Sequence, residues 1–283
     1  MHIATIDYTH PEAGAAFAQS LRETGFAVII NHPLDWSLIQ SIYTEWLTFF
    51  KSEYKNNYRV RPEQKGGFFP TDLSETAKGE TVKDLKEFFH IFPSGVFPSE
   101  LSALSLNYYQ QAFGLAKHLL QWIQEFTPEH IRAAYSEPLP SMIEGAEGLL
   151  RVLRYTPVAT DQDYVRAAAH EDINLITILP AATAPGLQVK NAAGEWYDVP
   201  VEQNSLVINI GDMLQEASQF FYPSTTHRVV KFKDQDAQQE RISMPFFLQP
   251  RGDVVLSSRY TAGEYHAERM RELKVIQDGK ILL

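Results

Sequence analysis

The chain has 283 residues, of which 44% are hydrophobic and 21% charged, so it can bury a sizeable core without disulfides or structural metals. The formal net charge is −10 and the chain has no basic block, which argues against nucleic acid as the main partner. The chain contains no cysteine. Disulfides, thiolate metal sites and cysteine nucleophiles are therefore excluded, and any metal must be held by histidine, carboxylate or other oxygen ligands.

The N-terminal residues lack the basic stretch, apolar core and small-residue cleavage site of a secretory signal. The longest apolar runs, such as 26–30 and 173–179, are far too short to cross a bilayer. We therefore expect a cytoplasmic protein without a membrane partner. The sequence leaves the oligomeric state open.

The first part of the chain is expected to be rich in helices. Apolar residues at helical spacing predict a helix over 13–23 that ends at Gly25, and the apolar run 26–30 predicts a short buried strand. Asp35 is a suitable N-cap for a second helix, whose apolar face runs over 38–50.

Three longer segments follow. Residues 61–83 are polar and interrupted by Gly and Pro, which predicts a long loop. Residues 98–126 carry apolar side chains at steps of three and four, which predicts a long helix. Residues 136–145 are the best candidate for a linker between two domains, but they are short and lead directly into strands. We therefore favour one compact unit.

After residue 148 the pattern changes to short segments rich in β-branched or aromatic residues, separated by Pro, Gly and Asn. These segments are 149–155, 175–179, 187–189, 196–199, 205–209, 227–232 and 242–248. Many short strands at this spacing indicate an all-β sandwich or barrel. With a closing helix over 264–275, the expected fold class is mostly β with a helical layer.

His170 and Asp172 stand two residues apart at the start of a predicted strand, so strand alternation predicts that both side chains point to one face. His227 begins a later predicted strand, and a barrel can bring it opposite this pair. Two imidazoles and one carboxylate leave one side of a metal open, as in the facial triad of non-haem Fe(II) oxygenases. Taken alone, one H-x-D among nine histidines is a weak signal, and ordinary structural histidines are the alternative.

Arg241 and Ser243 share one face of a further predicted strand. A guanidinium fork with a hydroxyl beside it forms a good clamp for a carboxylate. The alternative is an arginine paired with an internal Asp or Glu. Beside His170, Asp172 and His227, we favour a carboxylate of a ligand.

Further segments follow one another in a recognisable order. In the second half these are 170–179, 186–189, 194–196, 206–214, 224–229 and 241–247, and in the first half 5–7, 25–32, 67–70 and 84–89. Together they resemble the isopenicillin N synthase-like branch of the 2-oxoglutarate/Fe(II)-dependent dioxygenases. The resemblance extends over nearly the whole chain.

This resemblance implies a double-stranded β-helix, or jelly-roll, core with N-terminal and C-terminal helices packed on it. It implies one compact unit over 1–283. Within that unit, 1–105 would be an N-terminal region of the non-haem dioxygenase type, and 148–250 would be the Fe(II)/2-oxoglutarate dioxygenase core.

The resemblance also implies roles for individual residues. His170, Asp172 and His227 would ligate Fe(II), while Arg241, Ser243 and Tyr155 would bind the cosubstrate 2-oxoglutarate. The side chain of Asn174 would point into the substrate pocket, and the aromatic residues Phe68 and Phe246 are candidates for the wall of that pocket. The chemistry would be centred on the metal, so we expect no separate acid–base residue.

The expected protein is an oxidoreductase that hydroxylates an unactivated C–H bond of a small molecule with O2 and 2-oxoglutarate, releasing succinate and CO2. One alternative is an isopenicillin N synthase-like oxidase that closes a ring or desaturates with Fe(II) and O2 alone. Such enzymes also keep an Arg-x-Ser for a substrate carboxylate. The other alternative is a non-catalytic metal- or ligand-binding or sensing protein on the same fold. The sequence does not identify the substrate.

Overall fold

The computed structural model describes residues 1–73, 86–156, 165–230, 240–273, 276–277 and 280–281. Within these ranges, no helix combines the length and apolar character needed to span a bilayer. The described residues form helices and strands that alternate at first and give way to a run of strands after residue 148.

The N-terminal elements match the expected ones closely. Strand β1 (Thr5–Asp7) pairs in parallel with β2 (Phe26–Ile30), and α1 (Ala13–Thr24) connects them. Helix α1 ends at Gly25, whose φ of 72° is a left-handed conformation that glycine adopts without a Cβ penalty. Helix α2 (Trp36–Lys51) begins at Asp35, whose carboxylate accepts a 2.8 Å hydrogen bond from the Ser37 amide.

Two expectations in the next segment need correction. The predicted loop over 61–83 contains the short strand β3 (Gly67–Phe69), which pairs with β4 (Lys86–Ile91); the part of this loop over 74–83 lies outside the described residues. The long helix α3 (Leu104–Phe126) starts six residues later than 98. The reason is that the Ser102 amide donates to the Glu45 carboxylate on α2 at 2.7 Å, so the preceding turn is tied to a neighbouring helix.

The C-terminal half supplies most of the strands. These are β5 (Leu149–Tyr155), β6 (Val165–His170), β7 (Ile176–Pro180), β8 (Leu187–Lys190), β9 (Trp196–Asp198), β10 (Leu206–Ile210), β11 (His227–Val230), β12 (Arg241–Ser243) and β13 (Phe246–Leu248). The strand expected over 242–248 is two strands, because Pro245 between them has no amide hydrogen for the ladder. Residues 231–232 of another expected strand lie outside the described residues.

The remaining helices are short or close the fold. They are η1 (Glu53–Tyr58), η2 (Thr71–Leu73), α4 (Glu129–Arg132), η3 (Ser141–Ile143), α5 (Asp212–Ala217) and α6 (Ala262–Glu272), followed by the strand pair β14 (Ile276–Gln277) and β15 (Lys280–Ile281). The candidate linker contains η3, whose Met142 and Ile143 are buried, so this segment is part of the core. Helix α6 begins with a capping box between Thr261 and Glu264.

The strands form two main sheets. The large sheet has the order β1-β2-β10-β7-β13-β5-β4-β3, with β12 also paired to β5, and the small sheet has the order β6-β11-β8-β9. One buried cluster joins Phe26 of β2, Phe88 of β4 and Leu153 of β5 to Val189 and Val229 of the small sheet, so the two sheets face each other. This arrangement confirms a jelly-roll core.

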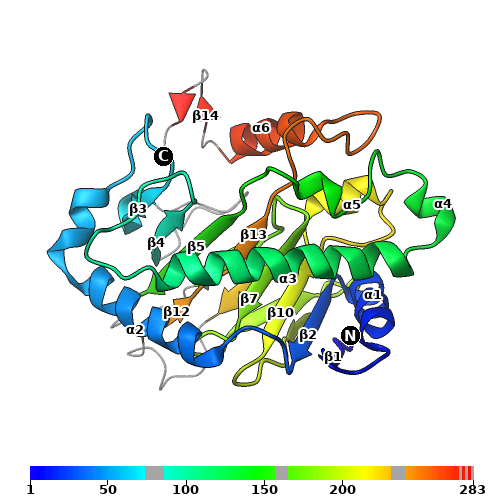
Figure 1. The fold of residues 1–283 in the computed structure, drawn as a ribbon, viewed down its shortest axis with the longest axis horizontal. Coiled ribbons are helices and arrows are strands. Elements are labelled where there is room, and N and C mark those ends of the chain that lie inside the picture. The colour runs from blue at the N-terminus through cyan, green and yellow to red at the C-terminus, as the bar shows by residue number, and fades with distance from the viewer. Residues whose placement is uncertain (74–85, 157–164, 231–239, 274–275, 278–279, 282–283) are drawn as a thin grey trace.

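Helices cover the other face of the large sheet. Figure 1 shows α3 lying across this sheet with α1 and α2 near its two ends. A second and larger cluster packs Trp46 of α2 and Leu119 of α3 against sheet residues such as Ile178 and Phe246. The large sheet is therefore buried on both faces, and the functional side chains must be sought on the face that meets the small sheet.

Candidate active site

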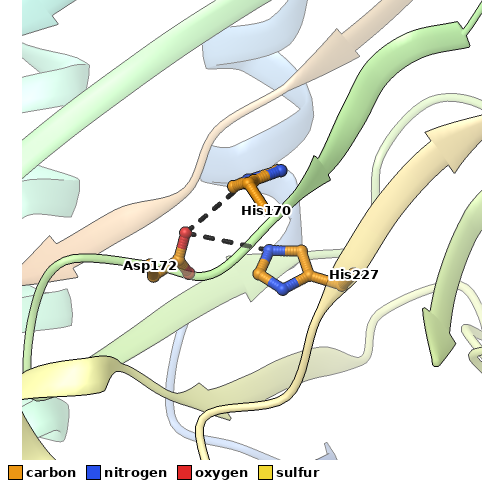
Figure 2. A group of neighbouring side chains, drawn as sticks. All are labelled: His170, Asp172 and His227. Carbon is orange, nitrogen blue, oxygen red and sulfur yellow. Dashed lines mark ion pairs between the residues drawn. The ribbon is translucent and has the colours of Figure 1, made fainter. Parts of the chain in front are cut away.

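Two histidines meet where β6 and β11 pair. His170 is the last residue of β6 and His227 the first of β11, and the two residues are directly opposite each other in the ladder. Their ring centroids are 4.4 Å apart. Figure 2 shows both rings turned toward Asp172, whose Oδ1 lies 3.8 Å from Nε2 of His170 and 3.7 Å from Nε2 of His227.

Asp172 reaches this position in a way that the sequence did not predict. It lies in the turn after β6, not on a strand with His170, so the argument from strand alternation was wrong although the two side chains do converge. Two backbone hydrogen bonds from another part of the chain fix this turn. The Asp212 amide donates to the Asp172 carbonyl at 2.9 Å, and the Met213 amide donates to the Asn174 carbonyl at 3.1 Å. Residues at the start of α5 therefore set the position of the carboxylate.

Both histidines are oriented by a contact on the far side of the ring. Nδ1 of His170 lies 2.7 Å from the Ala168 carbonyl and Nδ1 of His227 lies 3.1 Å from the Thr225 carbonyl. A carbonyl oxygen only accepts, so both Nδ1 atoms carry the proton and both Nε2 atoms present a lone pair.

The carboxylate of Asp172 is clamped through one oxygen. Its Oδ2 accepts hydrogen bonds from the Thr177 hydroxyl at 2.5 Å and from the Asn209 amide at 2.7 Å. The other oxygen, Oδ1, is the one that faces the two histidines. Sequence reasoning missed Thr177 and Asn209. The available signal was a polar residue inside an otherwise apolar strand, as Asn209 is in β10.

The protonation states of His170 and Asp172 favour the binding of a cation. The pKa of His170 is lowered to about 4, first by desolvation of a ring that still partly reaches solvent and then by the facing His227, so the ring is neutral at pH 7. Burial alone would raise the pKa of Asp172, but the two histidines and the hydrogen bonds from Thr177 and Asn209 lower it overall. The carboxylate is therefore ionised and ready to bind a metal.

These three residues fit a divalent iron ion. One ligand atom from each lies within 4.8 Å of the other two, which is the only group of at least three His, Asp or Glu ligand atoms of this kind among the described residues. Two neutral imidazoles and one carboxylate form the facial triad typical of non-haem Fe(II) sites, in which the remaining positions stay open for reactants. Fixed outer contacts on every ligand are also typical of such sites.

A buried guanidinium lies on the same face of the barrel. Arg241 on β12 is opposite Tyr155 on β5, its side-chain carbon Cζ lies 5.2 Å from the Tyr155 ring centroid, and it is only 2% exposed. Its Nε donates to the Ala184 carbonyl at 2.9 Å, whereas its Nη1 has no hydrogen-bond partner among the described residues. Ser243, two residues along the strand, is also buried.

Across the described ranges, no Asp or Glu pairs with Arg241. Burial lowers the pKa of this guanidinium, which shows that the charged form is costly where it stands. An anion beside Nη1 would offset that cost and satisfy the donor. The geometry therefore favours a carboxylate of a ligand over an internal ion pair.

The three residues expected at the substrate pocket lie elsewhere. Phe68 and Phe246 are buried in the cluster that faces the helices, where Phe246 contacts Tyr109 of α3 at a ring distance of 5.1 Å. Asn174 is fully buried against Gly211 and donates to the Thr177 hydroxyl at 2.8 Å. Asn174 thus supports the clamp on Asp172, and none of the three is brought to the open side of the triad.

Fold and site together define a non-haem iron oxygenase of the jelly-roll type. Residues 146–250 match the family model of the 2OG-Fe(II) oxygenase superfamily, and residues 3–106 match that of the non-haem dioxygenase N-terminal region described from morphine synthesis. A crystal structure from Shewanella oneidensis, provisionally assigned as an oxygenase, is 49% identical, with a TM-score of 0.88 over 98% of this chain and 100% of that chain. The protein belongs to the 2OG-Fe(II) oxygenase superfamily.

More distant relatives agree with this membership. Gibberellin 2-beta-dioxygenase from Phaseolus coccineus is 25% identical over 87% of this chain and 76% of its own length. A full-length protein from Neurospora crassa, crystallised in complex with alpha-KG and thymine, has the same fold, with a TM-score of 0.75, 21% identity, and coverage of 94% of this chain and 97% of that chain. The family's cofactor set is Fe(II) with 2-oxoglutarate (alpha-KG).

Proposed function

We propose that this protein is an Fe(II)- and 2-oxoglutarate-dependent oxygenase that hydroxylates an unactivated C–H bond of a small molecule, with release of succinate and CO2. The observation that carries this proposal is the triad of two neutral imidazoles and one clamped carboxylate, His170, His227 and Asp172. When bound, Fe(II) supplies the O2 chemistry that amino-acid side chains lack. The protein contributes binding, orientation and exclusion of water.

In this proposal the three triad residues hold the iron, and no other residue of the described ranges ligates it. Nε2 of His170, Nε2 of His227 and Oδ1 of Asp172 are the ligand atoms, since Nδ1 of each ring and Oδ2 of the carboxylate already have partners. Three protein ligands are sufficient because the other positions are needed for the reactants.

Arg241, Ser243 and Tyr155 would hold the distal carboxylate of 2-oxoglutarate. Support comes from the unsatisfied Nη1 of Arg241 and from the burial of all three side chains. A guanidinium binds a carboxylate through paired donors, and the hydroxyls of Ser243 and Tyr155 can add one hydrogen bond each. The buried end of the barrel would thus fix the cosubstrate.

We also propose that the whole chain, 1–283, acts as one unit in which 1–105 completes a core over 148–250. Phe26 on β2 and Phe88 on β4 belong to the same buried cluster as Val189 and Val229 of the small sheet, which supports this proposal. The N-terminal region would therefore supply part of the barrel wall.

The test is to follow O2 uptake and succinate formation by the Fe(II)-loaded protein, with and without 2-oxoglutarate. We expect both signals to require 2-oxoglutarate. The variant Arg241→Met should raise the apparent Kd for 2-oxoglutarate about 100-fold or more and leave the iron content unchanged, whereas His170→Ala should lose the iron. The matched control is Arg228→Met, because Arg228 stacks on Trp196 at 4.0 Å on the outer face of β11.

Other results would favour the alternatives. Oxygen consumption that proceeds without 2-oxoglutarate and yields no succinate would indicate an oxidase that uses Arg241 for its own substrate's carboxylate. Retention of iron and full activity by His170→Ala would refute the assignment of the triad. Binding of iron without any O2 uptake across a broad panel of small molecules would indicate a binding or sensing protein.

A further inference from the structure

The three residues before His227 each use a hydroxyl group to bind another part of the chain. Ser224, Thr225 and Thr226 lie between α5 and β11 in a segment that is neither helix nor strand, and we name them the hydroxyl segment. Such a segment has no ladder or helix to fix its backbone, so its side-chain hydrogen bonds decide its shape. None of the three residues binds iron or 2-oxoglutarate in the function proposed above.

The Thr225 side chain joins the hydroxyl segment to the N-terminal region. Its hydroxyl donates to the carbonyl of Thr24, the last residue of α1, at 2.8 Å. The next residue, Gly25, packs directly on Thr225, since a Cβ on Gly25 would lie well inside 3.0 Å of the Thr225 hydroxyl oxygen. Thr225 is therefore fixed against the end of the first helix.

The Thr226 side chain joins the hydroxyl segment to the other two iron ligands. Its hydroxyl donates to Oε1 of Glu171 at 2.9 Å, and Glu171 stands between His170 and Asp172 in the chain. The Thr226 carbonyl also accepts a 2.9 Å hydrogen bond from the Lys190 amide on β8. The segments that carry the three ligands are thus bonded to each other outside the metal site.

Ser224 fixes the beginning of the hydroxyl segment. Its amide donates to Oε1 of Gln215 on α5 at 2.8 Å, and its hydroxyl donates to the carbonyl of Ile210 at the end of β10 at 3.3 Å. All three residues of the segment are therefore held by elements that are distant in sequence.

The orientation of His227 depends on this segment. The Thr225 carbonyl accepts the proton on Nδ1 of His227 at 3.1 Å. That carbonyl belongs to the planar peptide group between Thr225 and Thr226, so the tethers of these two residues act on both sides of one rigid unit. The ring of Phe26 on β2 also meets the His227 ring edge to face, with centroids 5.5 Å apart and planes at 75°.

We propose that Thr225 and Thr226 are positioning residues for His227: their hydroxyl bonds fix the peptide group whose carbonyl orients the imidazole, so that Nε2 already faces the metal position. The direction of this ligand is then set partly by the N-terminal region, through Thr24, and partly by the segment of the other ligands, through Glu171. This inference rests on the proposed function, because it concerns the same iron site.

The two bonds are expected to differ in strength. Thr24 is buried and Thr225 is half-buried, so water competes little for the bond between them. Glu171 is exposed, and water competes more directly for its bond with Thr226. Loss of the Thr225 hydroxyl should therefore weaken metal binding more than loss of the Thr226 hydroxyl.

The experiment measures the affinity of the metal-free protein for Co(II) by calorimetry. Thr225→Val keeps the branched shape of the side chain and loses its hydroxyl, and we expect the Kd for Co(II) to rise about tenfold. Thr226→Val should raise this Kd about threefold. Thr225→Ser and Thr226→Ser keep the hydroxyl and should stay within about twofold of wild type.

A control variant separates positioning from general stability. Ser205 is fully buried before β10, at the opposite end of that strand from Asn209, and its hydroxyl donates to the Glu202 carbonyl at 2.7 Å. Ser205→Ala thus removes a hydroxyl-to-carbonyl bond of the same kind. The melting temperature should fall in both Ser205→Ala and Thr225→Val, whereas the Kd for Co(II) should rise only in Thr225→Val.

Proton NMR of the Co(II)-loaded protein measures the environment of each imidazole. Co(II) shifts the signals of its ligand rings away from the other protons, and each ring contributes one exchangeable Nδ1 proton. In wild type the His227 proton should exchange with water more slowly, because the side chain of His227 is 9% exposed and that of His170 is 41% exposed. Thr225→Val should shift the His227 signal and speed its exchange, and leave the His170 signal unchanged.

The proposal is overturned if both valine variants bind Co(II) as tightly as wild type, if Thr225→Ser is weakened as much as Thr225→Val, if Ser205→Ala loses the same affinity, or if the His170 and His227 signals respond equally. Failure of the proposed function is a different result. In that case the wild-type protein binds no metal through the triad, or it binds metal but neither binds nor converts 2-oxoglutarate.

Discussion

The hydroxyl of Thr177 donates a 2.5 Å hydrogen bond to Oδ2 of Asp172. Thr177 on β7 is also opposite Asn209 on β10, which donates to the same oxygen at 2.7 Å. Two adjacent strands of the large sheet therefore hold one oxygen of the carboxylate, and the other oxygen is left for the metal. Because the donors lie on paired strands, the orientation of Asp172 depends on the sheet and not on the turn alone.

Removing this hydroxyl is expected to weaken metal binding. The variant Thr177→Val keeps the shape of the side chain but loses its donor to Asp172. We expect the affinity for Mn(II) to fall about 10- to 100-fold, the usual effect of losing an outer contact of a metal ligand. Calorimetric titration of the metal-free protein checks this. Thr177→Ser retains the hydroxyl and should stay close to wild type; equal losses in both variants would contradict the clamp.

Gly211 is expected to tolerate no side chain. A Cβ at this position would lie well inside 3.0 Å of both the backbone and the side chain of Asn174. Gly211→Ala should therefore displace Asn174, which donates to Thr177, and lower both metal affinity and the melting temperature. Gly114→Ala on α3 is the control, since a Cβ added there would have no atom of the described residues within 4 Å apart from its own stretch of helix. That change should stabilise the protein by about 0.5–1 kcal/mol, and a similar gain in Gly211→Ala would refute the close packing.

Arg154 is expected to be important for stability and not for chemistry. It lies on the helix side of β5, where its guanidinium pairs with Glu87 at 2.7 Å and with Glu240. All three side chains are largely buried, with Glu87 only 6% exposed. Arg154→Met leaves two buried carboxylates whose remaining ion-pair partners among the described residues are Lys55 and Lys51. We expect a loss of about 2–4 kcal/mol in the free energy of unfolding.

Urea denaturation of this variant gives the measurement. Lys117→Met is the comparison, because Lys117 and Glu144 form an exposed pair at 3.1 Å. Exposed pairs contribute less than about 1 kcal/mol. If Arg154→Met also lost less than about 1 kcal/mol in the free energy of unfolding, the ion pairs of Arg154 would contribute little to stability.

Asp212 is expected to make the metal-free protein less stable as the pH rises. Burial raises its pKa to about 7, and the nearby carboxylate of Asp172 contributes to the increase. The pKa of Asp212 in the folded state exceeds its unfolded value of 3.8. The contribution of this carboxyl group to the stability of the fold is therefore fully present below pH 3.8 and is lost as the pH rises through 7. Asp212→Asn removes this titration, and its advantage over wild type should grow from about pH 5 to about pH 8, by at most about 4 kcal/mol.

Melting temperatures of both proteins across this range provide the check. The lowered pKa of His170 acts in the opposite direction, because that stabilisation is present above pH 6.5 and is lost as the pH falls toward 4. It is common to both proteins and cancels in the difference. A difference that does not change with pH would show that Asp212 is already ionised at the acidic end of the range.

The sequence predicted the fold class and the three converging metal-binding residues well, and it failed at identifiable places. The helices over 13–24 and 36–51 and most strands after 148 carry strong periodicity. Clear signals also mark helix boundaries: Gly25 ends the first helix and Asp35 begins the second. The position of Asp172 was mistaken because its turn is held by amides of Asp212 and Met213, which are distant in sequence. Local alternation contains no information about such contacts.

The aromatic residues were assigned to the wrong side for a related reason. The large sheet is covered by helices on one face and by the small sheet on the other, so residues of both faces are apolar and buried. Phe88 and Phe89 illustrate this, since both are fully buried but belong to different clusters. Composition cannot tell which of two such neighbours faces the triad, and register against β5 is needed to decide.

The sequence by itself determined which chemical groups are present and in what order: two imidazoles, one carboxylate, and an arginine with a serine two residues on. These follow from residue types and short spacings, which are local properties. Only the tertiary structure decided which atoms face the metal and that Thr177 and Asn209 hold the carboxylate. Those relationships join strands that pair across long stretches of chain, and they arise only when the sheets have formed.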